Sequence, residues 1–445
     1  MAAREEWRSH SGFVLATIGA AVGLGNIWRF AYIVGENGGG AFLLLYFGCV
    51  LLIGLPLVIA ELTLGRRAQG DAVAAFSGVG IAPGWRLVGW WCGVGAVLIL
   101  SYYSVISGWA LRYFAGAASG GLWESAADGY GAFFARFIGD GMAPAGWQAA
   151  MLALAMFVVA GGVRRGIELV SRWLMPVLAA IVVVLAGFAL TLEGGGAGVE
   201  FLFAPDWSVL ARPSAYGAAL GQAFFSVGVG MAVYVTYGSY VPRSFALPAS
   251  AGVVVFGDTL FAMVAGLAIF PAVFALGGDP AAGPELAFIT LPQILLQMPA
   301  GRVVGVVFFF LLTAAALTSM IALLEVVVAM LVHRWNWRRW SATAAAGMAI
   351  FVVGLPSALS YGLLREVQLG GKAILDAIDA AVSSILLPMG GLLVAAFVGW
   401  ALRRGDALRD AGIDDGAVGS IWLWLLRIGA PAAIAVILAR TIFSF

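Results

Sequence analysis

Long apolar runs recur along the chain, with short polar stretches between them. Each run is long enough for an α-helix to cross about 30 Å of hydrocarbon, which takes about 20 residues. The alternating apolar and polar positions of a membrane β-barrel do not occur. We therefore expect an all-α polytopic membrane protein. The predicted spans, eleven in number, cover residues 11–34, 41–64, 88–113, 146–162, 167–191, 214–241, 250–277, 301–332, 339–362, 374–402 and 418–442.

The N-terminal segment also has features of a secretory signal, because basic residues precede an apolar run. However, Glu5 and Glu6 lie in its leader, and the apolar run continues past Asn26 and Arg29. We expect this segment to be the first span of the mature chain.

Composition and charge agree with a membrane protein. Hydrophobic residues make up 62% of the chain and charged residues 11%, whereas about a quarter of a soluble domain is charged. The net charge of +1 gives no reason to expect a nucleic-acid partner, and the expected surroundings are a lipid bilayer. Loops on the side of the N-terminus hold most of the basic residues, which predicts a cytoplasmic N-terminus and, with eleven spans, an extracytoplasmic C-terminus.

Several kinds of chemistry are not expected from this sequence. Cys49 and Cys92 belong to separate spans and lack metal-ligand spacing. The two histidines, His10 and His333, do not suggest a usual metal site or a hydrolase triad. A Walker A motif is missing, so ATP is not the expected energy source. We do not expect an enzyme.

The first span contains GAAVGLGNIWRF at residues 19–30, an unusual stretch for a membrane helix. Its glycines alone fit close helix packing equally well. Asn26 and Arg29 favour a functional break instead, because buried polar and charged groups are costly in a membrane. An unwound segment would free carbonyl oxygens, and oxygen ligands suit a small hard cation.

The sixth span repeats this feature in GQAFFSVGVGMAVY, residues 221–234. Spans one and six begin two consecutive sets of five spans, and paired broken helices are typical of inverted-repeat transporters. We predict a single transporter domain, residues 1–445, with repeats over 11–191 and 214–402 and an additional span over 418–442.

The motifs also support a specific family. GAAVGLGNIWRF followed by GENGGGAF (35–42) resembles the first-span signature of the neurotransmitter:sodium symporter family. Further matches follow in family order: GLPLVIAELTLGR (54–66), YYSVISGW (102–109), GQAFFSVGVGM (221–231), GLAIFP (266–271), ALTSMIALLEV (316–326) and LDAID (375–379). The sequence is most similar to the bacterial amino-acid branch, which implies a bacterial-type inner (plasma) membrane.

The resemblance implies two sodium sites. The first would use the Ala21 carbonyl with the side chains of Asn26, Ser226 and Asp258. The second would use the carbonyls of Gly19, Val22 and Ala315 and the hydroxyls of Thr318 and Ser319. In the alternative interpretation of the second site, the Thr318 and Ser319 hydroxyls bond the preceding helical turn. In the alternative interpretation of the first site, Asp258 lies solvated near the inner headgroups.

The resemblance also bears on chloride. Ala262 stands where the family carries a chloride-linked serine or a substituting glutamate, and Tyr46 and Gln222 occupy the neighbouring positions. Asp258 can supply the fixed negative charge itself, which implies transport without a chloride requirement. The same carboxylate can take a proton on the return step.

The implied substrate is an amino acid. Its carboxylate would meet the N–H groups of Leu24 and Gly25 and the hydroxyl of Tyr103, at a half-helix N-terminus. Its ammonium group would face the carbonyls near Ala21, Phe225 and Ser226. The side-chain pocket would be formed by Ile99, Tyr103, Phe225, Gly228, Met231, Ser319 and Leu323, which favours a neutral hydrophobic or aromatic side chain.

Two gates are implied. At the outer gate, Arg29 would pair with Asp379 above Tyr103 and Phe225. The inner gate would use Arg4, Trp7, Ser239 and Tyr240, but His333 stands where an aspartate is expected. Since histidine carries no permanent negative charge, this gate has to use another acid or a different arrangement.

The spacing in span five has two open interpretations, and two acidic residues have an expected role. The spacing from Gly166 to Pro176 resembles the family pattern for unwinding span five, but it fits a surface loop before an ordinary helix start equally well. Glu61 and Glu325 are expected to bind freed backbone groups.

The sequence therefore predicts a sodium-coupled symporter that imports an amino acid by alternating access. A membrane sensor that kept the site but lost transport is the alternative, favoured by His333 alone. The paired gates argue against a channel.

Overall fold

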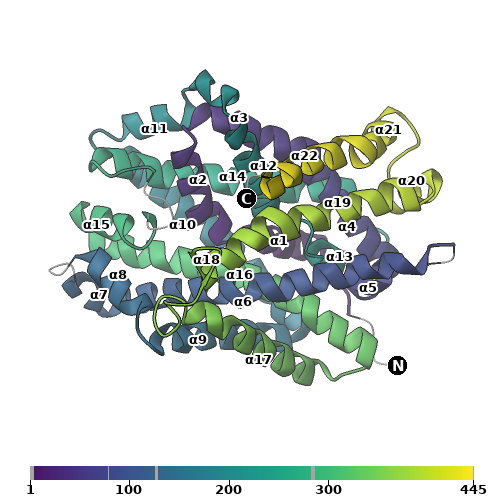
Figure 1. Cartoon of the computed structure of the whole chain (residues 1–445), viewed down its shortest axis with the longest axis horizontal. Helices are drawn as coiled ribbons and strands as arrows, with labels where there is room; N and C mark the ends of the chain where they lie inside the picture. The colour runs from purple at the N-terminus through teal and green to yellow at the C-terminus, as the bar shows by residue number, and fades with distance from the viewer. Residues whose placement is uncertain (1–4, 79, 126–128, 282–285, 444–445) are drawn as a thin grey trace.

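The computed structural model describes residues 5–78, 80–125, 129–281 and 286–443, and these are almost wholly helical. The long helices run side by side along the longest axis of the molecule (Figure 1). A short antiparallel hairpin is formed by β1 (Gln368–Leu369) and β2 (Lys372–Ala373). The predicted all-α class is confirmed.

The elements of the first half follow the predicted spans and the loops between them. They are α1 (His10–Ala21), η1 (Gly25–Arg29), α2 (Phe30–Glu36), α3 (Gly40–Cys49), η2 (Val50–Gly54), α4 (Leu55–Ala68), α5 (Ala72–Ala75), η3 (Pro83–Trp85), α6 (Arg86–Ser119), α7 (Gly121–Glu124), α8 (Tyr130–Ile138), α9 (Ala143–Ala160), η5 (Val163–Ile167), α10 (Glu168–Leu190), α11 (Gly196–Phe203) and η6 (Trp207–Ala211).

The second half begins with a split helix and continues with long helices. Its elements are α12 (Pro213–Val227), α13 (Val233–Ser239), α14 (Leu247–Ala275), α15 (Thr290–Gln297), α16 (Gly301–Trp335), α17 (Arg339–Ala358), α18 (Ile374–Ala381), η8 (Val382–Leu386), α19 (Leu387–Ala396), η9 (Phe397–Ala401), α20 (Arg404–Ala411), α21 (Ala417–Trp424), η10 (Leu425–Gly429) and α22 (Ala430–Phe443).

Among the described residues, nine helices are long and apolar enough to cross a membrane, or ten if the bent pair His10–Ala21 and Gly25–Glu36 is one span. That pair bends by 53°. The predicted sixth span is divided between α12, with 15 residues, and α13, with 7, and neither is long enough to cross alone. The count of eleven spans therefore stays a prediction.

Both predicted helix breaks are present. Val22, just after α1, has an extended backbone (φ −68°, ψ 108°). Between α12 and α13, Gly228, Gly230 and Ala232 have φ of 76°, 89° and 59°. A side chain on Gly230 would also meet the carbonyl of Leu387 on α19, so this position needs glycine for two reasons.

Glu61 stabilises the second break, as predicted. Its Oε1 accepts a hydrogen bond of 2.6 Å from the Gly230 N–H, and the Tyr234 hydroxyl donates across the break to the Val227 carbonyl. The carboxylate and the hydroxyl thus satisfy backbone groups that the missing helical turn leaves unpaired.

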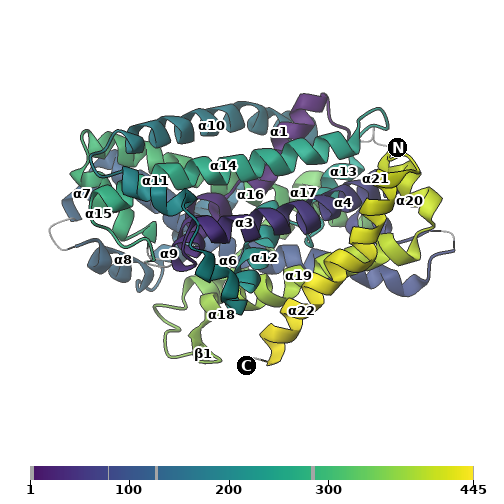
Figure 2. The ribbon, with the colours of Figure 1, turned by 90° about the horizontal axis from the view of Figure 1, so that it is seen from above.

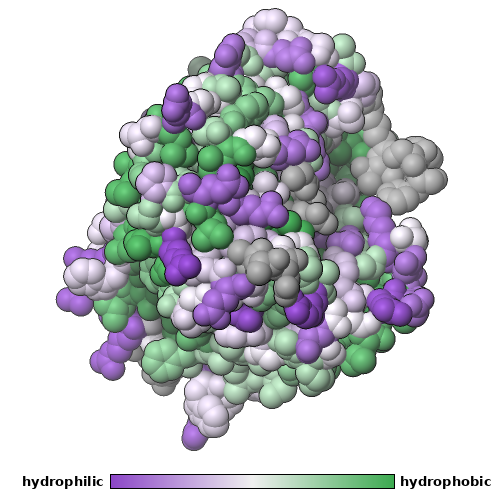
Figure 3. All heavy atoms as spheres, turned by 90° about the vertical axis from the view of Figure 1, so that its left-hand side faces the viewer, coloured by the Kyte–Doolittle hydropathy of each residue, from purple (hydrophilic) through white to green (hydrophobic). Residues whose placement is uncertain are grey.

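The breaks lie midway between two ends of different structure. Short helices α7, α8, α11 and α15 cover one end, and the N-terminus, α5 and α20 lie toward the other (Figures 1 and 2). Figure 3 looks at the first of these ends and shows hydrophilic residues spread over it among apolar ones.

Candidate functional site

A cavity of about 40 Å³ lies between the two helix breaks, with α6, α16 and α19 completing its wall. Most of the predicted pocket residues line it: Ala21, Gly25, Ile99, Tyr103, Phe225, Gly228, Met231, Ser319 and Leu323. Leu24 and Ser226 are not in the lining but are next to lining residues in the chain, and the Leu24 N–H donates a hydrogen bond to the hydroxyl of Tyr103, which lines the cavity.

The sequence analysis missed several lining residues: Gly23, Val227, Val233, Tyr234 and Leu387. Gly23 and Val227 are next to predicted residues in the two breaks, and Val233 and Tyr234 begin α13 just after the second break. Leu387 is different, because it comes from α19. The glycines Gly390 and Gly391, one turn further along, were the available signal, since they let α19 approach the backbone of the second break.

Hydrogen-bond donors gather at the start of η1. The Leu24 N–H donates to the Tyr103 hydroxyl at 3.0 Å, and the Gly23 N–H donates to Asn26 Oδ1 at 3.0 Å. A side chain on Gly25 would overlap the ring of Phe225. Bare backbone at a helix N-terminus, beside a phenolic hydroxyl, is a suitable place for a carboxylate.

Beside the cavity, the predicted first sodium site forms one buried polar cluster. Asn26 Nδ2 lies 2.7 Å from Asp258 Oδ1 and 3.1 Å from Ser226 Oγ. Ser226 Oγ donates to Asp258 Oδ2 at 2.8 Å and accepts from the Tyr46 hydroxyl at 3.2 Å. Asp258 is fully buried, so it is not at a solvated headgroup region. A buried carboxylate with neutral oxygens around it suits a monovalent cation.

The residues of the predicted second sodium site come from the end of α1 and from α16. Thr318 Oγ1 and Ser319 Oγ each lie 3.3 Å from the Val22 carbonyl, which the first break frees. Thr318 Oγ1 also donates to the Ala315 carbonyl at 2.8 Å, so the alternative contact with the preceding turn exists as well. A side chain on Gly19 would be tight against Met175 and would lie 3.4 Å from Thr318 Cβ. Carbonyl and hydroxyl oxygens from α1 and α16 thus lie together.

Near the predicted outer gate, the Arg29 guanidinium lies over the Phe225 ring, 4.5 Å from its centroid, and reaches the Gly221 carbonyl at 3.5 Å. Within the described part of the chain, no ion pair joins Arg29 to Asp379. Their direct pairing stays a prediction.

At the predicted inner gate, Trp7 and Tyr240 are both buried. Trp7 Nε1 donates to the Tyr237 carbonyl at 3.0 Å, and the Trp7 N–H donates to the Tyr240 carbonyl at 3.2 Å. Ser239 Oγ donates to the Thr236 carbonyl at 2.7 Å. Arg4 lies outside the described residues.

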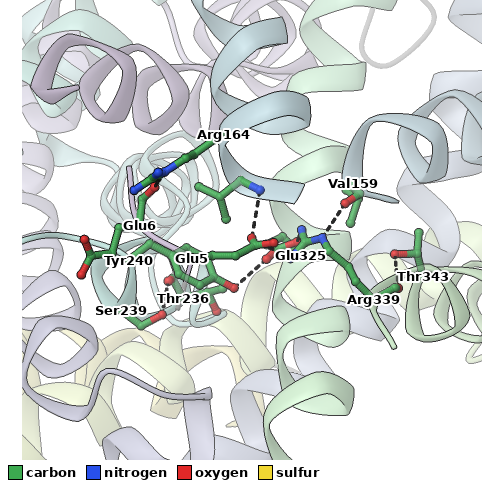
Figure 4. Close-up of polar contacts among 11 residues, drawn as sticks. Glu5, Glu6, Val159, Arg164, Thr236, Ser239, Tyr240, Glu325, Arg339 and Thr343 are labelled. Carbon is green, nitrogen blue, oxygen red and sulfur yellow. Dashed lines mark hydrogen bonds and ion pairs between the residues drawn. The ribbon is translucent and has the colours of Figure 1, made fainter. Parts of the chain in front are cut away.

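Glu325 has other partners than the sequence analysis expected. It accepts a hydrogen bond of 2.6 Å from the Tyr240 hydroxyl and forms an ion pair with Arg339, rather than binding freed backbone (Figure 4). The reason is the following helix: α17 begins with Arg339, which brings a guanidinium back to the buried carboxylate.

Span five begins with helical structure rather than a surface loop. Gly166 lies in η5, and Pro176 lies inside α10. A side chain on Gly166 would overlap the Val158 carbonyl, so η5 packs tightly against the end of α9.

Comparisons with known proteins agree with this arrangement. The model of the sodium:neurotransmitter symporter family matches residues 4–131 and 140–445. The chain belongs to this family. An uncharacterized sodium-dependent transporter, YhdH, of Bacillus subtilis (strain 168) is 40% identical over 98% of this chain and 97% of its own. The sodium-dependent nutrient amino acid transporter 1 of Drosophila melanogaster is 26% identical over 85% and 68%.

The fold is also that of a solved family member. The crystal structure of MhsT in complex with L-phenylalanine matches with a TM-score of 0.92 and 47% identity, over 98% of this chain and 99% of that one. The family and these neighbours support sodium-coupled amino-acid transport across a membrane as the activity of this fold.

Proposed function

We propose that this family member couples sodium entry to import of a neutral hydrophobic or aromatic amino acid by alternating access. The observation that carries the proposal is that the cavity and the polar cluster around Asp258 use consecutive residues of α12. Phe225 lines the cavity, and the next residue, Ser226, hydrogen-bonds the buried Asp258. A substrate and a cation bound there would stabilise the same turn of α12.

The cavity lining supports the substrate class. Its surface is mainly apolar, with hydroxyls from Tyr103, Tyr234 and Ser319. MhsT, which shares the fold, was crystallised with L-phenylalanine. A Cβ on Gly228 would lie 3.6 Å from Met231 Cε, so the absence of this side chain leaves room beside Met231, which favours large substrate side chains.

The ion roles are part of the proposal. The first sodium would be held by Ala21, Asn26, Ser226 and Asp258, and the second by Gly19, Val22, Ala315, Thr318 and Ser319. Asp258 makes a chloride ion unnecessary, because it brings the negative charge to the cluster. The neighbouring Ala262 offers no hydroxyl for an anion.

The topology completes the proposal. The two halves, 11–191 and 214–402, form the inverted repeats, and the arginine-rich loops keep the N-terminus cytoplasmic in a bacterial-type inner membrane. The C-terminus would be extracytoplasmic.

Uptake into proteoliposomes tests the function. The purified protein is reconstituted, and labelled phenylalanine, tryptophan, leucine, tyrosine and alanine are compared with sodium or potassium outside, each with chloride or gluconate. We expect accumulation that needs sodium and is unchanged in gluconate. Binding that needs sodium without accumulation would indicate the sensor, and chloride dependence would contradict the role of Asp258.

A further inference from the structure

An apolar groove with a volume of about 540 Å³ lies between α12 and α22, which are close together in Figures 1 and 2. The end of α3, η2 and η6 complete its wall. From α12 it is lined by Tyr216 and Leu220, and from α22 by Val436 and Ile437. Tyr216 and Val436 are exposed, so the groove is open to the surroundings of the chain.

The surroundings of this groove are hydrocarbon rather than water. Its α22 wall belongs to the helix Ala417–Ala439, which is apolar enough to cross a membrane, and only 33% of the most apolar stretch of that helix is buried. In a bilayer, acyl chains are the solvent of such a surface and are as apolar as the side chains that they contact. The occupant that suits the groove is therefore an acyl chain.

Aromatic side chains mark one end of the groove as the headgroup level. Trp207 of η6 is 60% exposed and Tyr216 is 45% exposed, and such rings gather where the hydrocarbon meets the headgroups. The Tyr216 hydroxyl donates a hydrogen bond of 3.1 Å to the Leu210 carbonyl, so its polar end is directed toward η6. A lipid in the groove would thus have its headgroup beside η6.

Two opposite charges lie at this end. Arg212 is between Ala211 and Pro213 in the chain, and both of these line the groove. Its Nη2 lies 3.7 Å from Asp206 Oδ2, and the two side chains are 49% and 54% exposed. An ion pair that is so long and so exposed is weak, so both charges are available to a ligand. Arginine binds phosphate well, and a carboxylate accepts hydrogen bonds from an ammonium group.

We propose that this groove is a binding site for a zwitterionic phospholipid with a primary ammonium group, phosphatidylethanolamine. One acyl chain lies between α12 and α22, the phosphate contacts Arg212 and the ammonium contacts Asp206. The acyl chain gains little free energy over the bilayer, because both environments are apolar. The preference for this lipid therefore comes from its headgroup.

The lipid would also stabilise the wall of a second cavity. Leu220 and Ile437 line the groove and, in addition, a polar cavity of about 230 Å³ that contains Arg29, Ser383 and Ser384. These two apolar residues thus stand between the hydrocarbon and a polar space. An acyl chain packed against them supports that wall from the lipid side. The lipid site does not depend on the proposed transport function.

Photo-crosslinking of the full chain in nanodiscs tests the site. The nanodiscs consist of phosphatidylcholine with a small fraction of a probe lipid whose acyl chain carries a diazirine. The probe is either phosphatidylethanolamine or phosphatidylglycerol with the same chain, and mass spectrometry of peptides locates the adducts. We expect the phosphatidylethanolamine probe to label residues 207–220 and 430–439 more than other lipid-facing segments, and more than the phosphatidylglycerol probe does.

Two substitutions test the headgroup contacts. Arg212→Gln should lower labelling of these segments by phosphatidylethanolamine about fivefold, the effect of one exposed charged contact. Arg365→Gln is the control, since Arg365 is exposed and pairs with its neighbour Glu366. Asp206→Asn should abolish the preference for phosphatidylethanolamine over phosphatidylglycerol, because Arg212 then faces either phosphate without a carboxylate beside it. The asparagine can still accept the hydrogen bond from the Ser208 N–H.

A third substitution tests the position of the acyl chain. Val436→Trp fills the groove and should remove most of the adducts. Val418→Trp is the matched control, because Val418 is exposed on α21 in the same span and does not line the groove.

The lipid site is rejected if the two probes label the groove equally in the wild type, or if adducts are spread evenly over all lipid-facing helices. Protection of both segments from either probe would also reject it, since a second copy of the chain would then cover the groove. If Val436→Trp does not fold, the comparison of probes on the wild type and on the surface variant Asp206→Asn still decides.

Discussion

The charge of Asp258 gives the sharpest test of the ion site. Asp258→Asn keeps the shape of the side chain but removes a buried negative charge 2.7 Å from Asn26 Nδ2 and 2.8 Å from Ser226 Oγ. We expect a weaker sodium affinity, because neutral oxygens alone would then have to replace the hydration shell of the cation.

The size of the loss follows from two opposing terms. A sodium ion about 4 Å from a unit negative charge gains about 4 kcal/mol at an effective dielectric constant of about 20. The ion-free state also loses charge-assisted hydrogen bonds from Asn26 and Ser226, each contributing about 1.5–3 kcal/mol against about 1 for a neutral one. Together the two bonds offset about 1–4 kcal/mol, so the net loss is at most about 3 kcal/mol and about 1.5 kcal/mol at the middle of the range, which is about tenfold in sodium affinity.

The assay is a sodium titration of labelled-phenylalanine binding in nanodiscs, in chloride and in gluconate. Asp415→Asn is the control, since it removes an exposed charge paired with Arg404 far from the cluster. Chloride should not rescue Asp258→Asn alone. The double variant Asp258→Asn/Ala262→Ser should regain sodium affinity in chloride but not in gluconate, because a hydroxyl then stands near Tyr46 and Gln222. Wild-type sodium affinity in Asp258→Asn would refute the reasoning.

Other substitutions test the remaining parts of the site. Thr318→Val removes one hydroxyl near the Val22 carbonyl and should weaken sodium binding about tenfold, or about 1.4 kcal/mol. Thr313→Val on the same helix removes a hydroxyl that donates to the Phe309 carbonyl and should leave sodium binding unchanged. Leu387→Ala enlarges the cavity and should raise the ratio of kcat/KM for tryptophan over leucine about tenfold, which competition uptake measures. Gly166→Ala overlaps the Val158 carbonyl and should cost about 1–3 kcal/mol of stability in thermal unfolding, whereas Gly187→Ala, with open space around it, should be near neutral.

The helix breaks could be predicted because their signal is local. Asn26 and Ser226 stand out beside glycines within apolar runs, where buried polar groups are costly. Such a local pattern fixes the position of a break and the chemistry beside it. For the same reason the hydroxyls of Thr318 and Ser319 were recognised only with the family motif, since hydroxyls are common in ordinary membrane helices.

The partners brought together by packing were not predictable in this way. Glu5 and Arg339 are 334 positions apart, and no periodicity connects them. Glu325 was expected to accept hydrogen bonds from freed backbone N–H groups, because a buried acid needs a donor. The sequence does not show that the following helix brings the Arg339 guanidinium to it instead. Leu387 was missed because, in an apolar helix, the residue type alone does not distinguish a leucine that faces a cavity from its apolar neighbours.

The two predicted gates are held by different interactions, and on the proposed mechanism this difference has a mechanical consequence. Near the predicted inner gate Arg339 forms ion pairs with Glu5 and Glu325, whereas near the predicted outer gate Arg29 rests on the Phe225 ring. Phe225 also lines the cavity. A substrate side chain in the cavity would therefore contact the ring on which the guanidinium is stacked, which would couple occupancy to the position of Arg29. Outer closure would need a shift of this ring and cation, while inner opening would have to break charged contacts. On this proposal, substrate binding drives the first step, and release of sodium from the cluster at Val22 contributes to the second.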